Sequence, residues 1–257
     1  MTPVLAFDIE TVPDIEGLRK LHGLGPELAP ADIADMAFQL RRQTAGNDFL
    51  PLHVQKVVAI SCALRDKNDF RVWSLGSPTD TEAELIRRFF DGIDKYTPQL
   101  VSWNGGSFDL PVLHYRSLIH SVQARCYWDM GDDDREFKWN NYLSRYHMRH
   151  LDLMDLLALY QPRSSAPLDE LAKLMGFPGK LGMDGSQVWN AYQKGEIGAI
   201  RNYCETDVVN TYLVFLRFQL MRGILNAEQY ERECELVRLT LSKSSELHWQ
   251  EFLGQWM

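Results

Sequence analysis

The chain has 257 residues, of which 45% are hydrophobic, and a formal net charge of -8. A chain of this length and composition can bury a full core, and the composition gives no reason to expect a long disordered segment. The negative charge argues against a wide basic face that coats nucleic acid, although a nuclease is compatible with it because clustered carboxylates that hold cations add negative charge. We therefore expect residues 1–257 to form a single domain.

The first part of the chain has the pattern of three strands and one helical insertion. Residues 3–10 are a short apolar run that predicts a buried strand. Residues 14–50 show helical spacing interrupted by prolines, which predicts a helical insertion. Residues 56–65 and 70–75 are β-rich runs on either side of the turn-like residues 66–69, and they predict an antiparallel hairpin.

A helix, a strand and a second helix are expected next. Apolar residues at helical spacing end before Thr97, and residues 99–103 then form a short apolar run that predicts a strand. The glycine-containing turn at residues 104–107 leads into a predicted helix over residues 108–115. Asp109 would lie at the start of this helix.

The second half of the chain favours helices throughout. The predicted helices cover residues 151–159, 168–175, 186–194, 197–220 and 227–244. Strands followed by helices suit an α/β fold in which helices flank a mixed sheet. We expect a helical C-terminal extension over about residues 221–257 whose apolar stripe packs on the domain. The alternative for this stripe is a partner or dimer contact.

Cysteine usage and hydropathy indicate the compartment. Cys62, Cys126, Cys204 and Cys234 lie far apart, without the paired spacing of a zinc site, so we expect free thiols. No apolar stretch approaches the roughly 20 residues that a membrane span requires. The sequence begins on a strand-like run and not on a secretion signal. We expect no membrane contact and a cytoplasmic location.

Carboxylates and one tyrosine form a pattern that suits metal-dependent chemistry. Asp8 and Glu10 share one face of their strand because strand residues two apart point the same way. Tyr203 and Asp207 stand one turn apart on a helix. Magnesium prefers such oxygen ligands, and two such ions can clamp a phosphodiester during displacement. Each pair taken alone is also compatible with a solvated turn or a chance helical spacing.

Three segments together resemble a known family. Residues 7–11, 103–111 and 203–207 are similar to the three exonuclease motifs of the proofreading domain of family B DNA polymerases, in the tyrosine-bearing DEDD subclass. The similarity runs from about residue 3 to about residue 220 and is closest to a bacterial group of stand-alone predicted 3′-to-5′ exonucleases. The resemblance implies a ribonuclease H-like fold.

The resemblance also implies roles for five residues. Asp8, Glu10 and Asp207 would ligate the first of two Mg²⁺ or Mn²⁺ ions, and Asp8 would bridge to the second ion. Asp109 would hold that second ion directly or through water, and Tyr203 would orient the attacking water. These five residues are the expected catalytic set, and its four carboxylates are the expected metal ligands.

Further residues are candidates for substrate contact. Thr11, Asn104 and Phe108 lie within the matching motifs and would hold the terminal nucleotide, while structural roles as turn or core residues remain open. Residues 135–150 interleave cations and aromatic side chains, a composition that suits a guide for single-stranded nucleic acid. A solvated loop packed by its own aromatic residues is the alternative for this segment.

The implied activity is hydrolysis at 3′ ends of single-stranded nucleic acid with release of nucleoside 5′-monophosphates. DNA is the expected substrate, and an exoribonuclease acting on RNA is an alternative. A chain of 257 residues leaves no room for polymerase domains, so proofreading or DNA repair would involve a polymerase or repair partner in trans. A catalytically silent nucleic-acid-binding or polymerase-associated module is the alternative from another class. The sequence leaves the oligomeric state open.

Overall fold

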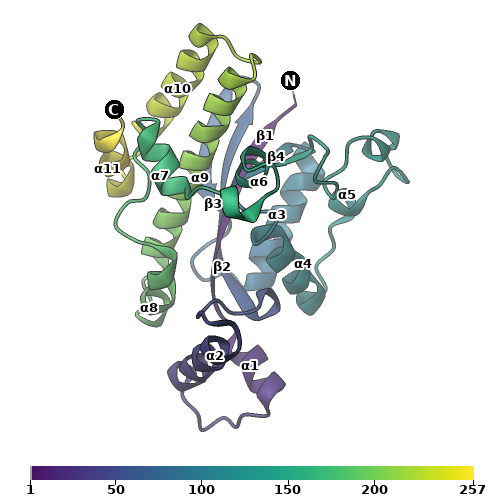
Figure 1. Ribbon diagram of the computed structural model, residues 1–257, viewed down its shortest axis with the longest axis vertical. Coiled ribbons are helices and arrows are strands. Elements are labelled where there is room, and N and C mark those ends of the chain that lie inside the picture. The colour runs from purple at the N-terminus through teal and green to yellow at the C-terminus, as the bar shows by residue number, and fades with distance from the viewer. Residues whose placement is uncertain (1) are drawn as a thin grey trace.

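A mixed β-sheet with helices on both faces organises the protein, as the computed structural model of residues 2–257 shows (Figure 1). Within those residues the sheet has five strands in the order β3-β2-β1-β4-β5. The strands are β1 (Val4–Pro13), β2 (Gln55–Asp66), β3 (Asp69–Ser74), β4 (Gln99–Ser102) and β5 (His150–Asp152). β1 pairs antiparallel with β2 and parallel with β4. The predicted ribonuclease H-like α/β fold is confirmed.

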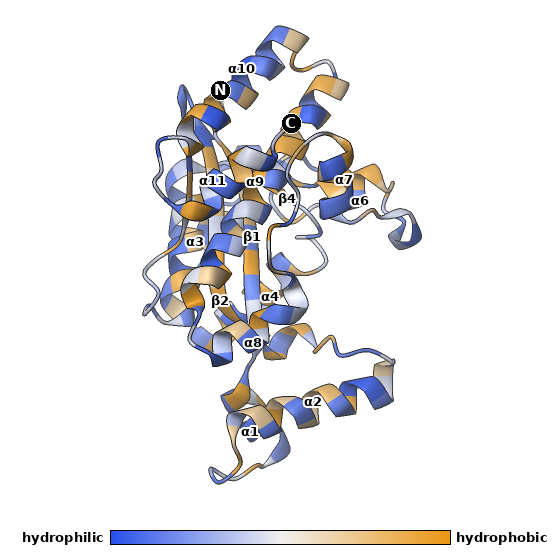
Figure 2. Cartoon of the chain, turned by 90° about the vertical axis from the view of Figure 1, so that its left-hand side faces the viewer, coloured by the Kyte–Doolittle hydropathy of each residue, from blue (hydrophilic) through white to orange (hydrophobic). Residues whose placement is uncertain are grey.

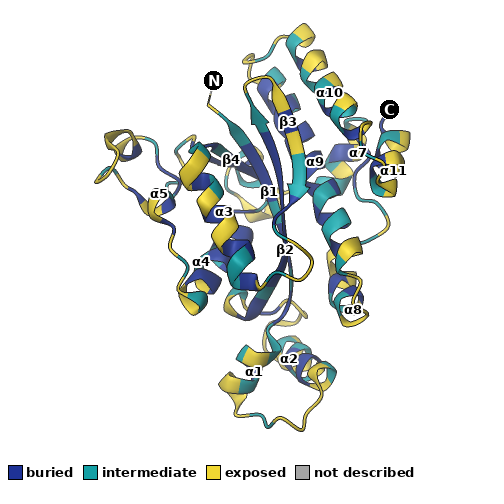
Figure 3. Ribbon diagram, turned by 180° about the vertical axis from the view of Figure 1, so that it is seen from behind, coloured by how far each residue is buried: buried dark blue, intermediate teal, exposed yellow. Residues whose placement is uncertain are grey.

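Helices cover both faces of the sheet. The α-helices are α1 (Ile15–His22), α2 (Pro30–Ala45), α3 (Glu82–Tyr96), α4 (Asp109–His120), α5 (Arg125–Trp128), α6 (Leu153–Leu157), α7 (Leu168–Leu174), α8 (Val188–Gln193), α9 (Ile197–Met221), α10 (Ala227–Leu241) and α11 (Leu247–Gln255). Short 3-10 helices are η1 (Leu52–Val54), η2 (Arg135–Lys138), η3 (Pro162–Ser164) and η4 (Gly185–Gln187). Helices α3 and α4 lie on one face and α9 with α10 on the other, so the central strands are buried on both sides (Figure 3).

The central strand β1 sends alternate side chains into two hydrophobic cores. Phe7 and Ile9 pack with side chains of α3 and α4 on one face of the sheet. Ala6 packs on the opposite face with side chains of α9. Because successive strand residues point to opposite faces, Asp8 and Glu10 are directed toward α9.

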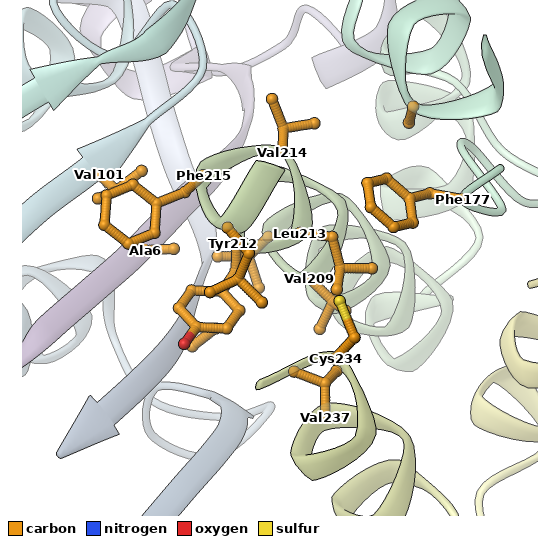
Figure 4. Packing of buried hydrophobic residues seen from close by; sticks show 14 of the residues in the cluster. Ala6, Val101, Phe177, Val209, Tyr212, Leu213, Val214, Phe215, Cys234 and Val237 are labelled. Atoms are coloured by element: carbon orange, nitrogen blue, oxygen red, sulfur yellow. The ribbon is translucent and has the colours of Figure 1, made fainter. Parts of the chain in front are cut away.

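Helix α9 is buried around most of its circumference, as expected for a helix inside a core. Its residues Tyr212 and Phe215 pack toward the strands, near Ala6 (Figure 4). On its other side, α10 contributes Cys234 and Val237 to the same cluster. The predicted packing of the C-terminal apolar stripe is thereby confirmed, whereas the last helix, α11, was not predicted.

Helices α1 and α2 lie apart from the sheet at one end of the molecule (Figure 2). They are inserted between β1 and η1 and bury a small core of their own. The buried members of that core are Leu18, Ile33, Ala37, Leu50 and Val54. Because Leu50 and Val54 belong to the connection back to β2, this core also fixes the path of the chain as it returns to the sheet.

The predicted helix over residues 151–159 is wrong at its start. The structure instead has strand β5 over His150–Asp152, and helix α6 begins only at Leu153. β5 pairs in parallel with β4, with His150 opposite Leu100. The leucine-rich segment has helical propensity, but pairing with a strand far away in the sequence overrides that local preference.

The cysteines form no disulfide among the described residues, as expected. All four cysteines are free thiols, and only Cys126 among them is partly exposed. No helix among residues 2–257 is long and apolar enough to cross a membrane.

A buried ion network holds α4 against the rest of the fold. The Arg116 side chain is 2% exposed, and its guanidinium donates to Asp14 Oδ2 at 2.6 Å and to Glu82 Oε1 at 2.7 Å. Glu82 Oε1 also accepts the backbone N–H of Val57 at 2.7 Å. Since Asp14 follows β1, Glu82 begins α3 and Val57 lies in β2, one arginine joins four elements.

Replacing Arg116 by methionine should lower the free energy of unfolding by about 3–5 kcal/mol, because the buried Glu82 carboxylate loses its charged partner. Urea unfolding followed by circular dichroism measures this change. Arg88→Met is the matched control, since the Arg88 side chain is 55% exposed in its pair with Asp80 and should contribute less than about 1 kcal/mol. Equal losses in the two variants would show that the network does not hold α4.

Burial of His150 on β5 should make stability depend on pH. Burial lowers the pKa of His150 to about 4, and its Nε2 lies 2.8 Å from Ser102 Oγ. Below its ordinary pKa of about 6.5 the unfolded chain binds a proton that the native state excludes, so stability is lost as pH falls toward 4, by up to about 3 kcal/mol. Urea titrations at pH 7 and 4.5 measure this loss of unfolding free energy. The loss should be smaller in His150→Gln than in the wild type, whereas His22→Gln, at an exposed position, should show the wild-type loss.

Candidate active site

Two of the predicted carboxylates lie side by side on β1. Alternation along the strand directs Asp8 and Glu10 toward α9, where Cys204 faces them. One ligand atom each from Asp8, Glu10 and Cys204 lie within 4.8 Å of one another. The Cys204 thiol donates to the Asp8 carbonyl oxygen at 3.4 Å, which packs α9 closely against β1 at this point.

Helix α9 supplies Tyr203 and Asp207 on the side that faces β1. The two residues are one helical turn apart, so their side chains lie on one stripe of the helix. Tyr203 is 4% exposed and Asp207 is 6% exposed. Both line the same cavity as Asp8 and Glu10.

Asp109 reaches the site from the first residue of α4. β4 pairs with β1 only at residues 4–6, so the N–H of Ile9 lies beyond the end of that ladder. Asp109 Oδ1 accepts this N–H at 3.1 Å, and Asp109 is 3% exposed. The hydrogen bond fixes the third predicted carboxylate beside the first two.

The turn before α4 is held by a carboxylate from β5. Asp152 accepts the backbone N–H of Asn104 at 3.0 Å and that of Gly106 at 2.8 Å. Asn104 adopts a left-handed conformation with φ 68°. A Cβ at Gly105 would collide with the side chain of Ser102 at the end of β4, so the tight turn requires glycine there. Asp152 therefore supports the turn that delivers Asp109.

Lys180 is a site residue that the sequence interpretation missed. Its Nζ donates to the Tyr203 hydroxyl at 2.6 Å and lies 3.6 Å from Asp207 Oδ2. It comes from the glycine-rich segment before η4, whose composition indicates a connection near the substrate but assigns no role to Lys180. Asn210 on α9 fixes this segment by accepting from and donating to the backbone of Gly179, at 3.2 Å and 2.8 Å. The one sequence feature that could have indicated this role is the presence of a lysine shortly before the third motif.

The structure brings most of the predicted residues together in one cavity of about 440 Å³. Its lining includes Asp8, Glu10, Asp109, Asp207, Tyr203, Asn104 and Phe108. Thr11 does not line this cavity. It follows a β-bulge after Glu10, and its hydroxyl donates to Gln55 Oε1 at 2.9 Å.

Crowding of negative charge dominates the electrostatics of this cavity. Burial, followed by repulsion from neighbouring carboxylates, holds the pKa of Asp8 and of Glu10 well above the ordinary range. Burial raises the pKa of Asp109 to about 7 and that of Asp207 to about 6, with Lys180 opposing the shift at Asp207. Burial also raises the pKa of Tyr203, so its phenol stays protonated at neutral pH.

The donor set fits hard divalent cations. Among the described residues, Asp207 Oδ1 is buried without a hydrogen-bond partner, which leaves a carboxylate oxygen available for a ligand. Lys180 is the single cationic side chain in the described lining of the cavity, against five carboxylates when Asp169 is included. The carboxylate oxygens of this set suit Mg²⁺ or Mn²⁺.

The basic and aromatic segment over residues 135–150 packs partly on its own side chains and partly, through Phe137 and Tyr142, on the core beside α3 and α4. Arg149 is 8% exposed, donates to the Asn140 carbonyl at 2.6 Å and lies 4.2 Å from the Phe137 ring centroid. No described residue of the segment lines the carboxylate cavity. These contacts favour the alternative of a loop packed by its own aromatic residues over that of a strand guide.

Comparison with known proteins agrees with this geometry. Residues 47–256 match the family described as a predicted 3′-5′ exonuclease related to the exonuclease domain of PolB. The matched segment contains Asp109, Tyr203 and Asp207 and begins after Asp8 and Glu10.

Two archaeal proteins are similar over about half of the chain. A DNA polymerase of Archaeoglobus fulgidus is 24% identical over 139 residues, which are 53% of this chain and 17% of the polymerase. DNA polymerase 1 of Sulfurisphaera ohwakuensis is 28% identical over 137 residues, or 52% of this chain and 14% of that protein. The chain thus covers only a small part of these relatives. From the family match over most of its length, the chain belongs to the predicted 3′-5′ exonucleases related to the exonuclease domain of PolB.

Proposed function

We propose that this protein is a divalent-metal-dependent 3′-to-5′ exonuclease of the tyrosine-bearing DEDD subclass. It removes nucleoside 5′-monophosphates from the 3′ ends of single-stranded nucleic acid, with DNA as the preferred substrate. The observation that carries the proposal is the meeting of Asp8, Glu10, Asp109, Asp207 and Tyr203 in one cavity. Membership of an exonuclease family supports it.

The four carboxylates are the proposed metal ligands. Asp8 and Glu10 from β1 and Asp207 from α9 would hold one ion, and Asp109 would hold the second with Asp8 shared between the ions. When bound, such cations polarise the scissile phosphate and lower the pKa of the attacking water. The unpartnered oxygen of Asp207 and the crowding of carboxylates support this assignment.

Tyr203 and Lys180 have proposed roles in positioning the attacking water. Because the Tyr203 oxygen accepts a hydrogen bond from Lys180, its own proton is directed to other acceptors, which are the neighbouring Asp207 carboxylate, a water or a phosphate oxygen. Lys180 also lies near Asp207, so it limits the rotation of the phenol and partly offsets the charge of the carboxylate. Tyr203 then orients the nucleophile without accepting its proton.

Asn104 and Phe108 line the same cavity and are proposed to contact the terminal nucleotide. Because the two similar archaeal proteins are DNA polymerases, we propose a role in proofreading or DNA repair beside a polymerase or repair partner in trans. The free cysteines fit a reducing cytoplasm. We further propose that residues 1–257 act as one exonuclease domain.

Degradation of a 5′-labelled single-stranded DNA oligomer tests the activity. With Mg²⁺ or Mn²⁺ the wild-type protein should shorten the oligomer stepwise from its 3′ end, and a chelator should stop the reaction. Asp8→Asn and Asp207→Asn should each lower kcat/KM by at least about a thousandfold, because several kcal/mol of transition-state stabilisation depend on these ligands. Asp69→Asn is the control, since the Asp69 side chain is 65% exposed at the edge of the sheet.

A matching RNA oligomer run in parallel decides between the two substrates. Faster loss of RNA than of DNA would replace the DNA preference by exoribonuclease activity. If the wild-type protein degraded neither polymer with any divalent metal, the silent binding module would be the better account.

Metal binding should also be visible in stability, without any substrate. Glu10→Gln removes one charge from the crowded cluster, so the metal-free variant should be more stable than the wild type by about 1–3 kcal/mol. Adding Mn²⁺ should raise the Tm of the wild type, since an ion that binds only the native state stabilises it. The same addition should shift the Tm of the variant much less. Equal Mn²⁺ shifts in the two proteins would remove Glu10 from the ligand set.

A further inference from the structure

A second cavity, of about 500 Å³, opens beside the carboxylate cavity and shares Glu10 and Phe108 with it. Four rings line it, and we call it the aromatic cleft: Phe38 from α2, Phe49 from the segment that follows α2, Phe108 at the start of α4, and Trp189 from α8. Its lining combines residues of the α1–α2 insertion with Trp189 of α8, and these elements lie toward the same end of the molecule (Figures 1 and 2).

Phe49 is exposed and yet held in place. It is 53% exposed, and its ring centroid lies 5.5 Å from that of Phe108. The Phe49 N–H donates to Asn47 Oδ1 at 3.0 Å, and its carbonyl oxygen accepts from Arg41 Nε at 2.7 Å. Hydrogen bonds thus hold both the N–H and the carbonyl group of Phe49, while its apolar ring faces solvent. A large exposed ring on a fixed backbone is preorganised for contact with a ligand.

The wall that carries Phe49 is tied to the strand that carries the carboxylates. The Leu50 carbonyl oxygen accepts from Gln55 Nε2 at 3.1 Å. Gln55 Oε1 in turn accepts the hydroxyl proton of Thr11, the residue after Glu10 on β1. The cleft is therefore held at a constant position relative to the proposed site of hydrolysis.

The lining of the cleft suits a flat, neutral ring system. No lysine or arginine side chain is among its described lining residues. Of its two acidic residues, Glu10 belongs to the proposed metal ligands, and Asp48 is paired with Arg42 at 2.5 Å. Aromatic side chains stack on nucleobases regardless of sequence because every base has a π face. Phosphates of the same strand would remain outside the cleft.

We propose that the aromatic cleft binds a nucleobase of the substrate strand next to the scissile phosphate, with Phe49 and Trp189 as its stacking residues. The inference rests on the proposed exonuclease function and extends it by assigning a task to the α1–α2 insertion. Continuity with the carboxylate cavity through Glu10 and Phe108 favours a nucleotide of the same strand as the occupant.

Steady-state kinetics on single-stranded DNA test the stacking residues. Phe49→Ala and Trp189→Ala should each raise KM by about tenfold, the effect expected for loss of one stacked base, and should change kcat by less than about twofold. Phe49→Tyr and Trp189→Phe retain a ring and should restore most of the affinity. Trp139→Ala is the matched control, because Trp139 is 77% exposed and does not line either cavity.

A modified substrate separates stacking from a general loss of structure. An oligomer without a base at the position next to the scissile phosphate should raise KM of the wild type by about the same factor as the alanine variants do. The same missing base should have little further effect on Phe49→Ala or Trp189→Ala. In a misfolded variant, the substitution and the missing base would each raise KM by its full factor, and the Tm would be lowered.

The proposed role of the aromatic cleft would be rejected if KM were unchanged in both alanine variants. It would also be rejected if the missing base raised KM in each variant as much as in the wild type. Neither result would contradict the exonuclease activity. The affinity of the chelator-treated protein for a fluorescent oligothymidylate, measured by anisotropy, gives an independent readout. This affinity should fall about tenfold in Phe49→Ala but not in Trp139→Ala. A wild-type protein that binds this probe through Phe49 yet degrades no nucleic acid would retain the cleft and reject the nuclease.

Discussion

Repulsion among buried carboxylates is the constraint on which the rest of this structure depends. Asp8, Glu10, Asp109 and Asp207 line one cavity, and burial raises the pKa of all four. Repulsion from the other carboxylates of the set raises the pKa of Asp8 and Glu10 further. Lys180 and the N–H of Ile9 offset only part of this charge. A cluster of this kind opposes folding unless the surrounding elements are rigid, or unless cations neutralise it.

Rigidity comes from elements that are themselves deeply packed. Helix α9 is buried on most sides and lies against β1, which is covered on both faces. Helix α4 is joined to the end of β1, to α3 and to β2 through the buried Arg116. The turn before α4 is fixed by Asp152 from β5. Each carboxylate therefore belongs to an element, or to the end of one, that is held in position by contacts outside the cavity.

In the proposed function, different elements of the fold provide metal binding and base recognition. Carboxylates on the sheet and on α9 would serve the metal ions, whereas the α1–α2 insertion and α8 would contact bases. Thr11 connects the two regions, because its hydrogen bond to Gln55 reaches the segment that carries Phe49. Substrate contacts could then vary through the insertion without disturbing the ligand set on β1.

Features that depend on local backbone geometry could be predicted from the sequence. The period of two along a strand placed Asp8 and Glu10 on one face, and the helical period placed Tyr203 above Asp207, because both follow from neighbouring backbone geometry. The order of strands and helices likewise indicated the mixed sheet. Strand β5, the contact of Lys180 with Tyr203, and the aromatic cleft were decided only by the tertiary structure. Each depends on segments far apart in the chain, whose meeting is set by packing and leaves no local periodicity in the sequence.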